Sequence, residues 1–415
     1  MQRIAVIGAG INGLALARQI MMDAPDAKIT IFEKEAMIAA HQSSHNSGVV
    51  HAGLYYEPGG LKARLCTRGA SLIRDYCAEQ GLPFDECGKV VVALSEDELP
   101  RLDAIYRKSV ANGVPGVRMI GPDELREIEP NGVGIRALYS PHTAIVSYGA
   151  IAARIATEIQ GWGATLRLSS PVARLSEKAE GVWVEGADGP IDEKPFDRVI
   201  ACAGLQSDRL AQASGDEDDP RIVPFFGQYY VVDPAFRNHV KGLIYPVPDP
   251  NYPFLGVHFT KRIDGEMTIG PNAFISIGRE NYSGRRFSLR DAANFGLYPG
   301  FWKFAARNMA VTAREMRTVV SKGTFVREAA RYVPSLSTVS VTPAVRGIRA
   351  QAMTRDGRLV DDFVIRTKGR VTHIRNAPSP GATSSMAIAE YIVRDVLKMR
   401  ETSSCRQSDL SPIGR

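Results

Sequence analysis

The amino terminus begins with two apolar runs separated by a helical pattern. Residues Arg3 to Ile7 form the first run, and Lys28 to Phe32 form the second. Between them, glycines are followed by apolar positions at helical spacing from Asn12 to about Met22. Strand, tight turn, helix and strand in this order predict the βαβ unit of a doubly wound nucleotide-binding fold.

The pattern changes after residue 220. From Ile222 to about Gly270, short apolar segments alternate with prolines, which is typical of an antiparallel sheet separate from the nucleotide fold. Ser288 to Ala330 is helical in pattern, strand-like segments return at Phe363 to Ile365 and Val371 to Ile374, and the final helix covers Ser384 to Met399. The same criteria predict helices at 60–80, 122–128 and 148–162, and strands at 90–94, 164–168, 182–184, 198–201, 229–232, 243–245 and 255–259.

The β-rich block lies between stretches of nucleotide-domain type, so we expect the second domain to be inserted. The expected nucleotide domain is discontinuous and comprises residues 1–80, 145–220 and 340–400. Residues 81–144 and 221–339 form the expected substrate or cap domain, and 401–415 a disordered tail.

Composition is that of an ordinary globular protein, with 415 residues, 44% hydrophobic and 23% charged. The chain has neither an apolar run of the roughly 18–20 residues that span a membrane nor a signal-peptide pattern at its amino terminus. The five cysteines are odd in number and form no CxxC pair, which argues against a disulfide framework and a zinc site. We therefore expect a cytoplasmic protein with inert thiols and no metal.

The net charge of +6 is concentrated in one stretch. Residues 279–331 contain 11 Lys and Arg against 4 Asp and Glu. Such a stretch can attract nucleic acid, anionic lipid or an acidic substrate. Aromatic and aliphatic residues interleave it, and it contains no RNA-recognition motif, so we favour solvated helical faces first, peripheral membrane docking second, and expect no nucleic-acid partner.

The first strand is followed by Gly8-x-Gly10-x-x-Gly13. The first glycine permits a tight turn, the second lets the backbone approach a pyrophosphate, and the third lets the helix lie close to the sheet. Glu33 lies twenty residues after Gly13 at the end of the second strand, where its carboxylate can accept hydrogen bonds from ribose hydroxyls and would repel a 2′-phosphate. This combination predicts a dinucleotide site and disfavours NADP.

Two later features favour FAD over NAD. A strand ends at Ala203-Gly204, and a Pro/Gly/Ser cluster lies near the carboxyl terminus. Three separated sites of close backbone approach suit a long cofactor. The segment from His41 to Tyr56 adds many small hydrogen-bonding residues at the place where the chain must pass from the pyrophosphate toward the flavin.

At these residues the chain resembles the FAD-dependent amino-acid and hydroxy-acid oxidoreductases of the D-amino-acid oxidase superfamily. Within it, the resemblance is greatest to the L-2-hydroxyglutarate oxidase/dehydrogenase family. It is carried by QSSHNSGVVHAGLYYEPGGLKARLC (42–66), LIYPVPDPNYPFLGVHFT (243–260), GIRAQAMTRDGRLVDDF (347–363) and NAPSPGATSSMAIAEYI (376–392). With the amino-terminal glycines, these motifs extend over nearly the whole chain.

The resemblance implies an α/β fold, with a Rossmann-like FAD-binding domain and an inserted antiparallel-sheet substrate domain. It also implies noncovalent FAD and oxidation of L-2-hydroxyglutarate to 2-oxoglutarate. The residues expected to bind the cofactor are Gly8, Ala9, Gly10, Asn12, Gly13, Glu33, Lys34, Ser43, Ser44, Asn46, Ser47, Gly48, Val172, Ala203, Gly204, Pro380, Gly381, Ala382 and Thr383.

Two departures from the family pattern bear on the substrate. Phe226 and Gln228 stand where such enzymes typically carry arginine and glutamate, and Ser147 stands where aspartate is usual. The first change removes one charge of each sign, which indicates either a replaced structural ion pair or a different substrate.

Oxidation of a 2-hydroxy acid requires a proton acceptor for the hydroxyl group and a partner for the carboxylate. Histidine is largely neutral at pH 7 and suits the first role, with His51 as first candidate and His258 as second. Arg349 matches the superfamily's carboxylate-binding arginine, and its planar fork suits that role. For a second carboxylate the sequence leaves four candidates open: Tyr56, Lys62, Arg64 and Tyr245.

The sequence leaves open other substrates within this superfamily and other classes of flavoprotein. The chain could instead be an amino-acid or sarcosine-type oxidase, act on another 2-hydroxy acid, or be a membrane- or tRNA-binding flavoprotein. The electron acceptor could be a quinone, reached by peripheral association with the inner membrane, or oxygen.

Overall fold

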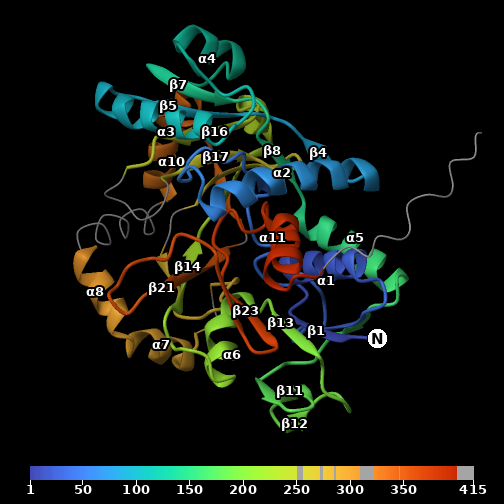
Figure 1. Ribbon diagram of the computed structural model, residues 1–415. Helices are drawn as coiled ribbons and strands as arrows, with labels where there is room; N and C mark the ends of the chain where they lie inside the picture. Colours follow the sequence, from blue (N-terminus) through green and yellow to red (C-terminus); the bar gives the residue numbers. More distant parts are fainter. Residues whose placement is uncertain (250–255, 272–273, 285–286, 309–321, 345, 400–415) are drawn as a thin grey trace, which may run out of the picture.

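The computed structural model describes residues 1–249, 256–271, 274–284, 287–308, 322–344 and 346–399 (Figure 1). Its two largest sheets lie at opposite ends of the molecule. An eight-stranded sheet with helices α3 (Leu99–Ala111) and α4 (Pro122–Ile128) is at the top of Figure 1, and a six-stranded sheet is at the bottom. The predicted disordered tail and residues 309–321 of the basic stretch lie outside the described residues.

The predicted amino-terminal βαβ unit forms the centre of the six-stranded sheet. The strand order is β22-β23-β13-β1-β2-β9, and all pairs are parallel except β22 with β23. Its strands come from three distant parts of the chain: β1 (Arg3–Ile7), β2 (Lys28–Phe32), β9 (Thr165–Arg167), β13 (Arg198–Ala201), β22 (Val364–Lys368) and β23 (Val371–Asn376).

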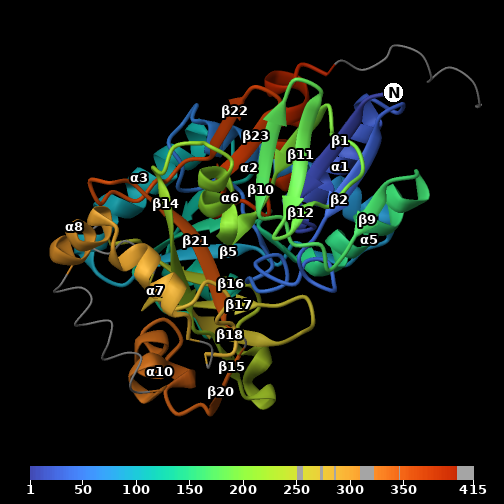
Figure 2. The ribbon, with the colours of Figure 1, turned by 90° about the horizontal axis from the view of Figure 1, so that it is seen from below.

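Both faces of this sheet are covered, which explains why its central strand is a continuous apolar run. Ile4 and Val6 pack in a core with helices α1 (Ile11–Asp23), α5 (Tyr148–Gly161) and α11 (Ser385–Tyr391). The alternate residues Ala5 and Ile7 pack on the other face against a small antiparallel sheet, which Figure 2 shows beside β1 and β2. That sheet contains β10 (Arg174–Lys178), β11 (Gly181–Gly186) and β12 (Gly189–Pro190).

The eight-stranded sheet is antiparallel except at one pair. That pair is β5 with β16, whereas the strands within the predicted stretch 222–270 pair antiparallel with one another. Its order is β20 (Val341–Pro343), β15 (Tyr230–Val232), β18 (Met267–Gly270), β17 (His258–Lys261), β16 (Leu243–Pro246), β5 (Lys89–Ala93), β7 (Arg136–Ser140) and β6 (Arg118–Ile120). Alternate residues of β5 enter different cores, Val90 and Val92 on one face and Val91 and Ala93 on the other.

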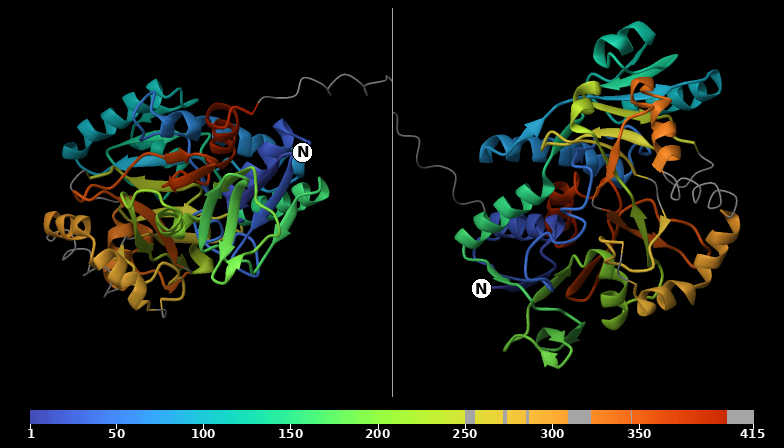
Figure 3. Two further views of the ribbon diagram at one scale, coloured as in Figure 1. Left: turned by 60° about the horizontal axis from the view of Figure 1, so that its bottom comes forward. Right: turned by 180° about the vertical axis from the view of Figure 1, so that it is seen from behind.

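A three-stranded sheet lies between the two large sheets (Figures 1 and 3). Strand β14 (Arg221–Gly227) pairs along its whole length with β21 (Gly347–Met353), and β19 (Phe274–Ile275) pairs on its other edge. Sequence patterns did not identify these strands as partners, because more than a hundred residues separate β14 from β21. Strand β20 pairs in the eight-stranded sheet, although we assigned residues from 340 onward to the nucleotide domain. The exact domain boundaries stay a prediction.

The remaining elements complete the two ends. Helix α2 ends where Gly81 adopts a positive φ of 63°, a conformation that glycine adopts readily. The helical stretch after residue 288 consists of three helices in the described part of the chain, and the final helix continues beyond α11 as a π-helical turn at Ile392–Val396. These further elements are α2 (Leu61–Gln80), α6 (Ser207–Ala213), α7 (Leu289–Gly296), α8 (Pro299–Arg307), α10 (Lys322–Ala330), β3 (Val49–Val50), β4 (Phe84–Asp85) and β8 (Ala144–Val146).

A buried ion pair ties the six-stranded end to the middle sheet. Asp208 of α6 and Arg279 are both inaccessible to solvent and form two hydrogen bonds, of 2.5 and 2.9 Å. The Arg279 guanidinium also donates to the carbonyl of Ile222 on β14, and Asp208 accepts from the Ile222 N–H group. Each charge is therefore satisfied only while these elements stay in place.

Replacing Asp208 with asparagine should lower the free energy of unfolding by about 3–5 kcal/mol, because the Arg279 charge remains buried without its counter-charge. Urea denaturation followed by circular dichroism measures this change. The control is Asp123→Asn, which breaks an exposed pair with Arg126 and should leave the midpoint nearly unchanged. Equal effects of the two substitutions would contradict this role of the buried pair.

Candidate active site

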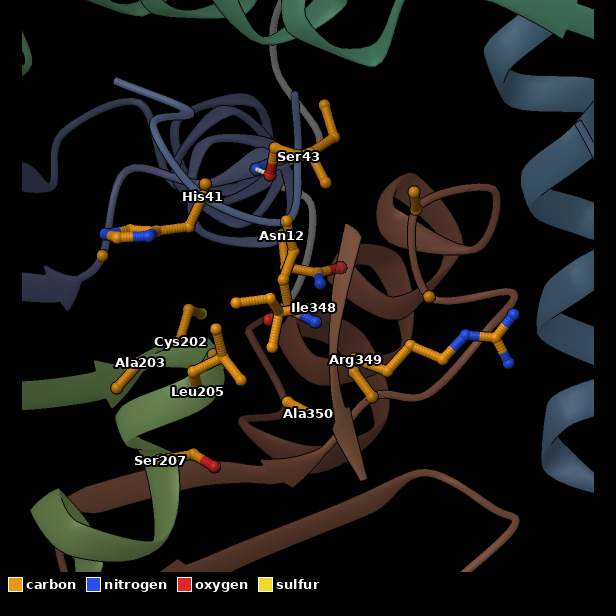
Figure 4. Close-up of a pocket in the computed structure, with 18 of the residues that line it drawn as sticks. Asn12, His41, Ser43, Cys202, Ala203, Leu205, Ser207, Ile348, Arg349 and Ala350 are labelled. Atoms are coloured by element: carbon orange, nitrogen blue, oxygen red, sulfur yellow. Dashed lines mark hydrogen bonds between the residues drawn. The ribbon is translucent and has the colours of Figure 1, made fainter. Parts of the chain in front are cut away.

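A cavity of about 660 Å³ lies where the carboxyl ends of β1 and β13 face the β14–β21 sheet. This volume is in the usual range for cofactor and ligand sites, and open α/β sheets bind ligands at the carboxyl ends of their strands. Figure 4 shows side chains from distant parts of the chain around it, including Asn12, Ser43, Ala203 and Arg349.

The glycine turn after β1 forms one wall of the cavity. A Cβ atom on Gly13 would lie 1.9 Å from the carbonyl oxygen of Gly8, and one on Gly8 would lie 2.5 Å from that of Cys202. Gly8 also has a positive φ of 104°, which L side chains rarely adopt. Only glycine at these positions lets α1 start directly above the strand, with its amino terminus at the cavity.

This wall has the polar groups that a dinucleotide requires. Gly10 caps α1 without a side-chain hydrogen bond. Asn12 lines the cavity, and its buried Oδ1 atom lacks a hydrogen-bond partner among the described residues. Helix amino termini bind phosphate groups, and a buried polar atom without a partner is costly unless a ligand supplies one. The wall therefore fits the ADP half of FAD.

The acidic residue at the end of β2 is placed as predicted. Glu33 is buried at the cavity, and its carboxylate accepts from the N–H groups of Ala9 at 2.8 Å and Glu35 at 3.0 Å. Ala9 is buried and does not line the cavity, so its part is to orient Glu33. Lys34 lines the cavity and forms ion pairs with Glu35 and with Glu280.

The segment after β2 is held in shape by its own side chains. Ser43 Oγ accepts from the N–H of Ile11 at 2.9 Å, and the Asn46 side chain bonds to three backbone groups of its own loop. Ser43, Asn46 and Ser47 line the cavity. Ser44 is exposed and does not. Gly48 is also absent from the lining, and its positive φ of 74° and its approach to Val146 explain the glycine instead.

The carboxyl-terminal cluster closes the other side of the cavity. Its predicted residues Pro380, Gly381, Ala382 and Thr383 line the cavity, together with residues 374–379, which were not predicted. The predicted Val172, Ala203 and Gly204 line it from other parts of the chain. Thr383 Oγ1 lies 2.9 Å from the Tyr148 hydroxyl and accepts from the backbone N–H of His51 at 3.2 Å. This contact fixes the backbone of the first candidate base beside the segment expected to meet the flavin ring.

Of the three candidate catalytic residues, two line the cavity. His51 and Arg349 do so, and Arg349 extends from β21 away from Ala203 and Leu205 (Figure 4). His258 on β17 is buried and does not line the cavity. Its ring contacts that of Tyr245 at 3.9 Å between centroids, and its Nδ1 lies 2.8 Å from the carbonyl oxygen of Gly256.

Burial and neighbouring positive charges lower the pKa of both histidines to about 3. Burial is the largest cause in each case, and Lys89 and Arg349 are among the cations that add to it. Both imidazoles are therefore neutral at pH 7, the form that accepts a proton.

The four candidates for a second carboxylate have different surroundings. Tyr245 is buried next to His258, and Tyr56 lies 5.0 Å from the Lys62 ammonium, measured to its ring centroid. Lys62 is buried but already forms a 2.7 Å ion pair with Asp361. Arg64 is exposed, because it lies on the opposite side of α2 from the buried Lys62 and Ala63, and it does not line the cavity.

The sequence reading missed Lys89, Tyr229 and Tyr148. Tyr229 and Tyr148 line the cavity, and Lys89 lies in a small adjoining recess that His51 also lines. Lys89 directly precedes the apolar run 90–94. A charged residue at the start of a fully buried strand is the one signal that could have identified it.

The departures from the family pattern have structural explanations. Phe226 and Gln228 do not line the cavity, whereas Gly227 and Tyr229 between and beside them do. The Arg346 guanidinium packs over the Phe226 ring at 4.7 Å and donates to the Gln228 side chain at 2.9 Å. Phe226 and Gln228 therefore both contact Arg346, outside the ligand space.

Ser147, the second departure, is the amino-terminal cap of α5. Its hydroxyl accepts from the N–H of Ala150 at 3.2 Å. Serine and aspartate serve this purpose about equally well, so the replacement leaves the helix start intact.

Comparison with known proteins agrees with this geometry. The model of the FAD dependent oxidoreductase family matches residues 3–394. Human mitochondrial L-2-hydroxyglutarate dehydrogenase is 40% identical over 407 residues, which cover 95% of this chain and 88% of the human protein. The L-2-hydroxyglutarate dehydrogenase of Salmonella houtenae is 39% identical over 404 residues, covering 97% and 95%. The resemblance inferred from the motifs is thus confirmed.

Solved structures confirm the fold class. Dithionite-reduced L-alpha-glycerophosphate oxidase from Mycoplasma pneumoniae, with FAD bound, aligns with a TM-score of 0.73 at 21% identity, covering 95% of this chain and 94% of the oxidase. Glycine oxidase from Geobacillus kaustophilus aligns with a TM-score of 0.68 at 19% identity, covering 97% and 96%. With a family model that matches nearly its whole length, and a glycine-lined cavity that fits the cofactor, this chain belongs to the FAD dependent oxidoreductase family.

Proposed function

We propose that the chain oxidises L-2-hydroxyglutarate to 2-oxoglutarate, with noncovalently bound FAD as the immediate electron acceptor. The observation that carries this proposal is the cavity that joins the glycine turn to His51 and Arg349. Relatives with the L-2-hydroxyglutarate dehydrogenase name match over 95% or more of the chain. The alternative substrates are amino acids, sarcosine-type amines and other 2-hydroxy acids.

In this proposal, Arg349 binds the C1 carboxylate through the two parallel hydrogen bonds that its fork geometry permits. His51 accepts the proton of the C2 hydroxyl group. When bound, FAD supplies the acceptor for the hydride that leaves C2, so that the alcohol becomes a ketone. The protein's own part is to orient the acid, hold the neutral imidazole at the hydroxyl group and exclude water.

Substrate charge assists the base. A pKa of about 3 makes His51 a weak proton acceptor in the ligand-free protein. Two substrate carboxylates would offset the positive charge of Lys89 and Arg349 and so raise the pKa of His51 toward neutrality. A dicarboxylic acid thus improves the base that acts on it.

The proposed reaction is tested by anaerobic addition of L-2-hydroxyglutarate to the purified flavoprotein, with D-2-hydroxyglutarate, glycine and sarcosine as controls. The flavin absorbance band should bleach with the L-acid alone. Bleaching by glycine or sarcosine instead would favour the amine-oxidase alternative, and bleaching by none of them would discard the substrate while keeping the fold.

Replacing His51 with glutamine should slow flavin reduction by about 10²–10⁴-fold, the usual contribution of a general base. Stopped-flow absorbance at saturating substrate measures this rate. His258→Gln is the matched control, because both histidines are neutral and only His51 lines the cavity. A greater loss in the His258 variant would transfer the base role to that residue.

A quinone or oxygen would then reoxidise the flavin, and an exposed surface supports peripheral membrane association. None of the described helices is both long and apolar enough to cross a bilayer. On and beside α7 and α8, Phe287, Leu289, Leu297 and Trp302 are between 62% and 82% exposed, and Arg290, Lys303 and Arg307 are exposed among them. Apolar side chains flanked by cations suit the surface of an anionic bilayer. This proposal combines two expectations from the sequence, a cytoplasmic protein and peripheral association with the inner membrane.

Vesicle sedimentation tests the docking surface. The protein should bind vesicles containing anionic lipid at low salt, and a Leu297→Ser/Trp302→Ser variant should bind at least several-fold more weakly. Met37→Ser, which removes an exposed apolar side chain elsewhere, should bind as the unmodified protein does. Absence of binding at low salt would eliminate membrane docking.

A further inference from the structure

Lys89 is a buried lysine that none of the described carboxylates pairs with. Lys89 is the first residue of β5, and only 2% of its surface is exposed. Its ammonium lies 3.7 Å from the centroid of the Tyr245 ring and 4.7 Å from that of Tyr55. Within the described ranges, neither a carboxylate nor a hydrogen-bond acceptor pairs with it. Burial lowers the pKa of Lys89 to about 7, which reflects the cost of holding the charge there.

The other buried cations differ in this respect. Lys62 pairs with Asp361, Arg279 with Asp208, and Arg375 with Asp216. A buried charge without a counter-charge is strongly unfavourable, and two aromatic faces offset only part of that cost. The position therefore calls for an anion from outside the protein.

Lys89 lies at a closed recess, too small to hold a water molecule, that shares His51 with the large cavity. The recess is also lined by Tyr55, Tyr56 and Thr143. Of the charges that lower the pKa of His51, Lys89 has the largest effect, and Arg349 is next. Two positively charged side chains, Lys89 and Arg349, therefore act on His51. In the proposed function Arg349 binds the carboxylate next to the reacting carbon, which leaves Lys89 without an assigned role.

We propose that Lys89 binds the distal carboxylate of a dicarboxylic 2-hydroxy acid and thereby sets the preference for a diacid. This inference rests on the proposed function. Lys89 reaches the ligand by rotation of its flexible side chain from the Tyr245 ring toward His51, and the two substrate carboxylates then match two cations. A monocarboxylic acid would leave the ammonium unpaired, so the site rejects it.

The discriminating substrates are L-2-hydroxyglutarate and L-2-hydroxypentanoate, which has a methyl group in place of the distal carboxylate. Lys89→Met should reduce the ratio of their kcat/KM values by about 100-fold, the scale expected when one partner of a buried charge pair is removed. Lys89→Arg, which keeps the charge, should recover part of the ratio. Lys261→Met is the charge control, because Lys261 pairs with Asp85 outside the site and should keep the ratio.

Binding without turnover gives a second readout. Calorimetric titration should show that Lys89→Met lowers the affinity for glutarate far more than the affinity for pentanoate. The flavin content should stay unchanged. Equal weakening of both acids, or an unaltered diacid preference, would overturn the assignment. If the unmodified protein does not oxidise L-2-hydroxyglutarate at all, the proposed function fails instead. The comparison of glutarate and pentanoate binding then still tests whether Lys89 binds the second carboxylate.

The unmodified protein offers a test that needs no variant. The titratable and charged groups around Lys89 and its neighbour His51 are His258, Tyr55, Tyr56, Tyr245, Cys66, Lys62 and Arg349. Both histidines are neutral above pH 7, and burial raises the pKa of Cys66 to about 12. Between pH 7 and 9, free Lys89 loses its proton and must regain it to bind a carboxylate. Glutarate affinity should therefore fall by up to tenfold per pH unit with proton uptake, whereas pentanoate affinity should not. The same pH dependence for both acids would contradict the proposal.

Discussion

The close contact between helix α1 and strand β1 determines where chemistry can occur in this molecule. Gly13 is in close contact with the carbonyl group of Gly8, and Gly8 with that of Cys202. Neither position has room for a Cβ atom. This contact holds three chain segments together at one edge of the sheet and points the amino terminus of α1 into the cavity. The residues of this contact would hold the dinucleotide end of FAD, and the 41–51 loop and the carboxyl-terminal cluster would hold the flavin.

At that other end the physical problem is charge. The middle sheet contributes Arg349, the eight-stranded sheet contributes Lys89, and the two histidines between them are neutral because of burial and of these cations. An interior of this kind is unfavourable while empty and becomes favourable when an anion enters. The inserted sheet therefore does more than cover the cofactor, because it supplies the cation that distinguishes acids by their second carboxylate.

Local patterns in the sequence were sufficient for much of this architecture. The apolar runs at Arg3–Ile7 and Arg198–Ala201 predicted their strands, and the glycine spacing with Glu33 predicted the dinucleotide wall. What local patterns could not supply were contacts between distant segments. The pairing of β14 with β21 and the parallel pairing of β5 with β16 depend on residues more than a hundred positions apart. For the same reason Lys89 was missed, Arg64 was included although it is exposed, and the replacements at Phe226 and Ser147 could be explained only after their neighbours were known.

A crystal structure of the flavoprotein with glutarate bound would test the central claim most directly. It should show FAD along the glycine turn, one glutarate carboxylate paired with Arg349, and the other within hydrogen-bond distance of the Lys89 ammonium. A glutarate whose second carboxylate faces solvent, with Lys89 still packed against Tyr245, would contradict the account of how this site selects its substrate.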